Sequence, residues 1–90
     1  MSYVKTLRGA IVARIIDGNE MNMIGSKIRK LRLERNWSQQ KVADQLEMLA
    51  IYICRGSISR IEDKSRTVTD IELFGLSQVF GVSIQELFEE

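Results

Sequence analysis

Residues 24–88 contain a series of start and stop signals that divide this part of the chain into short helices. Thr69-x-x-Glu72 and Ser83-x-x-Glu86 have the spacing of a capping box, in which a hydroxyl and a carboxylate bond reciprocally to the first turn of a helix. Ser38 is a suitable N-cap for an earlier helix, and Gly81 suits the left-handed position at which helices often end. A chain divided in this way is expected to fold as a set of short packed helices.

Apolar residues recur at helical spacing in each segment between these signals. The inward faces that we predict are formed by Ile24, Ile28, Leu31 and Arg35 in the first helix, Val42, Ala43 and Leu46 in the second, Ile58 and Ile61 in the third, Ile71, Leu73, Leu76, Val79 and Phe80 in the fourth, and Leu87 and Phe88 in the fifth. Asn36 suits the end of the first helix, and the third helix is expected over about residues 55–63. The sequence therefore predicts an all-α domain of five helices.

The segment before residue 24 has a weaker pattern. Residues 4–16 place apolar residues at helical spacing, although β-branched residues and a glycine leave a short strand as the alternative. Asp17-Gly18-Asn19 is typical of a turn or linker. We therefore divide the chain into an N-terminal extension, residues 1–23, and a domain, residues 24–88. One of the two methionines just before the domain is an alternative start of the protein.

Residue types that carry common active-site chemistry are scarce. The 90 residues include one cysteine, Cys54, and no histidine, which excludes an internal disulfide and deprives a zinc site of its usual ligands. Without a Gly-rich phosphate loop or a convincing carboxylate pair, we expect no enzymatic activity, no cofactor and no metal. No apolar run reaches the roughly eighteen residues of a membrane span, so we expect no membrane contact. Asp17-Gly18-Asn19-Glu20 is not the small-residue cleavage site that a secretory signal needs, so we expect a cytoplasmic protein.

The formal net charge of +1 conceals an uneven distribution of charge along the chain. Residues 24–66 carry ten Lys and Arg against five acids, which gives +5. Residues 67–90 carry five acids and no base, which gives −5. A basic part followed by an acidic part is typical of a compact protein that binds a nucleic acid.

The ordered motifs of residues 24–88 resemble the Cro/repressor helix-turn-helix family, the lambda-repressor-like domains of phage repressors and many bacterial regulators. The matching residues are Ile24-Gly25-x-x-Ile28-Arg29-x-Leu31-Arg32, Trp37-Ser38-Gln39-Gln40-x-Val42-Ala43, Ser57-Ile58-Ser59-Arg60-Ile61-Glu62, and Leu76-Ser77-Gln78-Val79-Phe80-Gly81-Val82-Ser83-Ile84-x-Glu86-Leu87-Phe88. The resemblance implies a transcriptional regulator, of repressor type, that binds specific sequences of double-stranded DNA. It also implies binding as a dimer on half-sites roughly 34–36 Å apart. We expect a weak homodimer, formed through the C-terminal helices or through residues 4–16.

The resemblance also implies roles for individual residues. The base contacts expected on the third helix are Arg55, Gly56, Ser59 and Arg60. Arg is a strong reader of guanine because it can bond O6 and N7 together. The phosphate contacts that we expect are Ser38, Gln39, Lys41, Ser57, Lys64 and Arg66. Glu62 would be structural and would form an ion pair with Arg32 of the first helix.

The connection between the second and third helices departs from the family pattern. The family's turn is short and usually contains Gly, whereas here the six residues 47–52 separate Leu46 from Ile53 and include no Gly. Residues 47–53 either extend the second helix or form a longer connection. Of the apolar residues Met48, Leu49, Ile51 and Tyr52, we expect two to pack in the core. An alternative function is an antitoxin or co-regulator whose domain mainly binds a protein partner, through residues 47–52 or residues 4–16.

Overall fold

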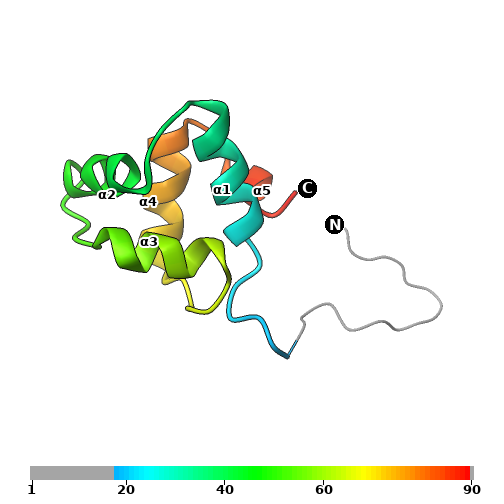
Figure 1. Ribbon diagram of the computed structural model, residues 1–90. Coiled ribbons are helices and arrows are strands. Elements are labelled where there is room, and N and C mark those ends of the chain that lie inside the picture. The colour runs from blue at the N-terminus through cyan, green and yellow to red at the C-terminus, as the bar shows by residue number, and fades with distance from the viewer. Residues whose placement is uncertain (1–17, 90) are drawn as a thin grey trace.

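The computed structural model describes residues 18–89, which form five helices and no strand (Figure 1). The helices are α1 (Gly25–Glu34), α2 (Gln39–Glu47), α3 (Arg55–Glu62), α4 (Asp70–Phe80) and α5 (Ile84–Leu87). Helix α3 crosses in front of α4, with α2 and α1 on either side, and α5 packs against α4. The predicted all-α fold of five helices is therefore confirmed. The expectations for residues 4–16 lie outside the described residues.

The helix ends follow the local signals of the sequence. At Ser38 the hydroxyl accepts from Lys41 N at 3.0 Å, and at Thr69 the capping box is complete. Ser83 Oγ accepts from Glu86 N at 3.0 Å, which is the hydroxyl half of the capping box predicted there. Gly81 ends α4 with φ +69°, in the left-handed region. Asn36, just beyond α1, has φ +57°. No helix within residues 18–89 is long and apolar enough to cross a membrane.

A single apolar core lies where the helices meet. Its buried members are Ile24, Ile28, Leu31, Val42, Ala43, Leu46, Ile53, Ile58, Ile61, Leu76, Phe80 and Leu87. Arg35 is half-buried, and its guanidinium donates to Phe80 O at 2.6 Å and lies 5.2 Å from the centre of the Phe80 ring. The inward assignments of Ile71 and Phe88 were wrong, since these side chains are 65% and 47% exposed. Ile71 lies about half a turn around α4 from Phe80, and the single turn of α5 buries only Leu87.

The connection from α2 to α3 is a loop, because α2 ends at Glu47. Ala50 takes a left-handed conformation, φ +62°, where glycine is more usual. Ile51 N then bonds back to Leu46 O at 3.0 Å, and the Ile51 side chain packs against Gly75 of α4, where an added Cβ would collide with Ile51 Cδ1. Only Ile51 of the four apolar loop residues packs against the core, whereas we expected two. Met48 and Tyr52 are each 78% exposed.

The N-terminus of α1 is fastened to the C-terminal end of α3 by Asn22. Its Oδ1 accepts from Ile24 N and Gly25 N at 3.1 and 2.8 Å, which replaces a cap that Ile24 cannot supply. Its Nδ2 donates to Ile61 O and Arg66 O at 3.1 and 2.8 Å. The two helices also touch directly at Gly25, where an added Cβ would collide with Ile61 O. The sequence analysis did not single out Asn22, although an Asn two residues before a helical pattern is a signal for such a cap.

Gly25→Ala should destabilise the domain by about 1–3 kcal/mol, because the new methyl group would push α1 away from the backbone of α3. Urea unfolding measures the change. Gly56→Ala on α3 is the matched control, since its Cβ would lie 3.7 Å from the nearest atom and Ala favours the helix. Equal stability of the Gly25→Ala variant and the wild type would refute the close approach of α1 and α3.

Glu72 provides a second test of the fold through its pH dependence. Arg66 donates to both carboxylate oxygens at 2.8 and 2.9 Å, and this hydrogen bonding lowers the pKa of Glu72 below its ordinary value. A lowered carboxylate pKa adds stability that is complete above the unfolded-state pKa and is lost as pH falls through the folded-state pKa. The wild type should therefore exceed Glu72→Gln in unfolding free energy at pH 7. That difference should shrink steadily as pH falls below about 4.3; a difference independent of pH would contradict the account.

Candidate nucleic-acid interface

Helix α3 has a buried face and an exposed face. Ile58 and Ile61 are fully buried, which fixes the side of the helix that meets the core. Gly56, Ser59 and Arg60 fall on the opposite side at helical spacing, and Arg60 is exposed. Gly56 and Ser59 are half-buried, so this side of α3 lies at the surface of the described chain.

Arg55 and Arg60 are the exposed cationic side chains of this helix. Arg55 is the first residue of α3, and within the described part of the chain its guanidinium makes no hydrogen bond or ion pair. Arg60 Nη2 donates to Ser57 Oγ at 3.0 Å, so this guanidinium is directed along its own helix. Both arginines can offer the paired donors that match O6 and N7 of guanine.

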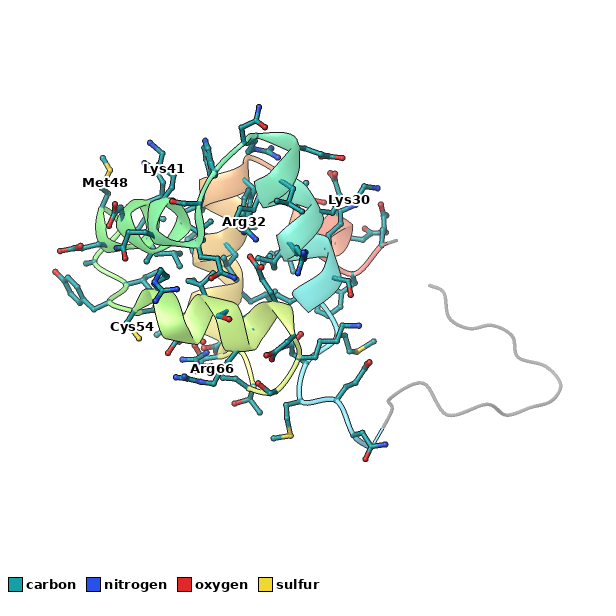
Figure 2. The ribbon with its side chains drawn as sticks, viewed as in Figure 1. Lys30, Arg32, Lys41, Met48, Cys54 and Arg66 are labelled. Carbon is teal, nitrogen blue, oxygen red and sulfur yellow. The ribbon has the colours of Figure 1, made fainter. Side chains whose placement is uncertain are left out.

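The position of α3 is held by a buried ion pair. Arg32 Nε lies 2.6 Å from Glu62 Oε2, and Arg32 Nη2 lies 3.0 Å from Glu62 Oε1, which is a bidentate contact between α1 and α3. Figure 2 shows Arg32 in the middle of the molecule, between α1 and α2. Only 11% of the Arg32 side chain and 3% of the Glu62 side chain are exposed. These are the two residues that the family resemblance pairs.

Two further bonds join the start of α2 to this pair. Arg32 Nη1 donates to Trp37 O at 2.9 Å, and Gln39 Nε2 donates to Glu62 Oε1 at 3.1 Å. Glu62, the last residue of α3, thus accepts hydrogen bonds from side chains of both α1 and α2. Gln39 was predicted at a phosphate, and its bond to Glu62 was not predicted. An amide nitrogen has two hydrogens, so Gln39 retains one donor for a ligand.

The six residues expected at phosphates do not form one cluster. Ser38 Oγ caps α2, and the exposed Lys41 ammonium lies 5.7 Å from the Trp37 ring. Lys64 Nζ lies 3.6 Å from Glu20 Oε1, and the Arg66 guanidinium is held by Glu72. The start of α2 therefore keeps an exposed cation beside free helical N–H groups, whereas the loop after α3 has both of its cations paired with carboxylates.

Cys54 caps α3 without the usual side-chain bond to the backbone. Its φ and ψ are those of an N-cap, −84° and 164°, but its Sγ contacts Ser57 Oγ at 3.5 Å. Hydrogen bonding from Ser57 lowers the pKa of this exposed thiol below its ordinary value, and the charge of Arg60 acts in the same direction. Figure 2 shows Cys54 at the end of α3 that adjoins the α2–α3 loop. The first turn of α3 is therefore a small polar cluster around Ser57.

Comparison with known proteins agrees with this geometry. The model of the helix-turn-helix family matches residues 28–87, which is two thirds of the chain and includes all of α2, α3, α4 and α5. The chain therefore belongs to the Cro/repressor-type helix-turn-helix family, a family of DNA-binding regulators that are not typically enzymes. None of the curated proteins compared with the chain matches it.

Glu62→Ala should lower the free energy of unfolding by about 3–5 kcal/mol, because it leaves the Arg32 guanidinium buried without its partner. Thermal and urea unfolding measure the loss. Glu47→Ala on α2 removes an exposed carboxylate and should change stability by less than about 0.5 kcal/mol. Loss of DNA binding by Glu62→Ala with an unchanged melting temperature would show that Glu62 acts at the ligand and not in the scaffold.

Proposed function

We propose that this protein is a transcriptional regulator of repressor type, which recognises specific sequences of double-stranded DNA by placing α3 in the major groove. The observation that carries the proposal is the division of α3. Its buried residues are Ile58, Ile61 and Glu62, whereas Arg55, at its start, and Arg60 are exposed. A groove-binding helix needs such a side with strong donors near its N-terminus. Arg55 and Arg60 have the donors required to read guanine.

The other proposed contacts are of two kinds, to base edges and to phosphates. Gly56 and Ser59 lie on the exposed side of α3, where they would approach base edges. Lys41 and Gln39 flank the start of α2, whose N–H groups and partial positive charge favour a phosphate. Ser38 is a hydroxyl donor at the same helix start, whereas Ser57, also predicted at a phosphate, lies on α3 with its Oγ bonded to Arg60. Lys64 and Arg66 would reach phosphates only by exchanging Glu20 and Glu72 for the ligand.

The proposal also covers the domain division, the oligomeric state and the location of the protein. Residues 24–88 would be the DNA-binding domain and residues 1–23 an extension to it. A weak homodimer would place two copies of α3 on successive turns of the duplex. The protein would act on DNA in the cytoplasm, without catalysis, cofactor or metal.

A second candidate function is binding of a protein partner, as an antitoxin or co-regulator does. The specific observation is the α2–α3 loop, in which Met48 and Tyr52 are each 78% exposed and Leu49 is 46% exposed. Large apolar side chains grouped on a surface are typical of protein contacts. Residues 4–16 are the other segment proposed for such a contact.

Salt dependence separates the two functions. A DNA-binding protein releases counterions, so log affinity for duplex DNA should fall linearly with log salt, by about 0.9 for each phosphate neutralised. Arg55→Ala should weaken binding to the preferred site by about 1–3 kcal/mol and relax specificity at one base pair. Lys30→Ala is the control, because Figure 2 shows Lys30 on the side of α1 away from α2. Affinity that does not change with salt, or unchanged binding by Arg55→Ala, would contradict the proposal.

A further inference from the structure

We infer that Ser57 is a positioning residue that turns Arg60 toward a base pair next to the one that Arg55 reads. This inference rests on the proposed function, because it concerns how the same DNA-binding side of α3 selects its sequence. It assigns a pair of guanines at neighbouring base pairs to the recognition site. It also assigns Gly56 the role of leaving room for Arg60.

The guanidinium of Arg60 lies back over the preceding turn of α3. Its Nη2 donates to Ser57 Oγ at 3.0 Å, three residues toward the N-terminus. Its Nη1 would lie 3.7 Å from a Cβ built on Gly56, four residues toward the N-terminus. The hydrogen bond to Ser57 holds the guanidinium over the preceding turn, on the exposed side of the helix and above Gly56. A methyl group at Gly56 would fit, whereas a longer side chain would occupy the space that Arg60 uses.

Ser57 is itself held in place by the cap of the helix. Its Oγ also contacts Cys54 Sγ at 3.5 Å, so one oxygen joins the cap residue to Arg60. An exposed arginine normally loses rotamer freedom when it binds a ligand, which lowers the affinity. A guanidinium that is already directed in the free protein loses less.

The direction of Arg60 determines what it can reach. Five residues separate Arg55 from Arg60, which is about 7.5 Å along the helix axis. Because the Arg60 guanidinium lies at the level of residues 56 and 57, it is displaced toward Arg55 by most of that distance. Base pairs repeat about every 3.4 Å. Five residues also turn the helix by about 140°. The two arginines therefore leave α3 on different sides of its N-terminal end, from which they would reach neighbouring base pairs.

Without the bond to Ser57, Arg60 would be free to extend toward the phosphate backbone. Phosphate contacts contribute affinity but carry no sequence information directly. The bond to Ser57 would thus favour contact of Arg60 with a base over contact with a phosphate. This differs from a direct phosphate contact by Ser57, which would weaken all duplexes equally when removed.

A double-mutant cycle tests the inference. Ser57→Ala, Arg60→Ala and the double variant are measured against the duplex preferred by the wild type and against duplexes with each guanine replaced in turn. Ser57→Ala should lower discrimination at one guanine by about tenfold and leave discrimination at the neighbouring guanine unchanged. It should have no further effect in the Arg60→Ala background, and Ser57→Thr, which keeps the hydroxyl, should restore discrimination. Thermal unfolding checks that each variant is folded.

A readout on the free protein separates this inference from the proposed function. The side-chain Nε–H signal of Arg60, observed by nuclear magnetic resonance without DNA, should show greater mobility in Ser57→Ala than in the wild type. Equal mobility, or an equal loss of affinity for every duplex, would overturn the role of Ser57 while leaving DNA binding in place. If the wild type binds no duplex in a salt-dependent way, the proposed function fails and the inference fails with it.

Discussion

The ion pair of Arg32 and Glu62 is the contact on which the arrangement of the first three helices depends. Burying two charges costs several kcal/mol for each ion, and only good geometry with further hydrogen bonds offsets that cost. The structure meets this condition, since Glu62 accepts from Arg32 twice and from Gln39 once, while Arg32 also donates to Trp37 O. Within residues 18–89, no buried side-chain nitrogen or oxygen lacks a partner. Glu62 ends α3, so holding it fixes the direction of that helix.

The exposed side of α3 follows from this anchoring. The core fixes the helix through Ile58 and Ile61, and Asn22 ties its C-terminal end to the start of α1. The core, Asn22 and the ion pair of Glu62 together hold this helix of eight residues, so its opposite side is kept in a fixed position. Rigid presentation matters for reading bases, because bidentate contacts to guanine require both donors to be placed together. The carboxylate that would repel DNA is thus part of the structure that presents the arginines.

Local signals in the sequence predicted most of the fold, and long-range contacts account for what they missed. Caps such as Thr69 and Gly81 act within one turn, so the residue pattern alone was sufficient to predict them. The link from Asn22 to α3 was missed because it depends on Ile61 O, 39 residues away in the sequence. Ile71 was misplaced because periodicity identifies a helical face but does not show where the neighbouring elements stop covering it. The base and phosphate contacts remain predictions, and the direction of each of these side chains depends on partners in the folded chain.

Selection of binding sites from random duplex DNA, at a stated salt concentration near 0.15 M, tests the central claim most directly. That claim is that the scaffold around Glu62 presents the arginines of α3 to the major groove. The account predicts enrichment of a sequence with guanines at neighbouring base pairs in each half-site, and half-sites about 10 base pairs apart if the protein binds as a dimer. A selected pool with no shared sequence would contradict it, because α3 would then contribute no base-specific contact.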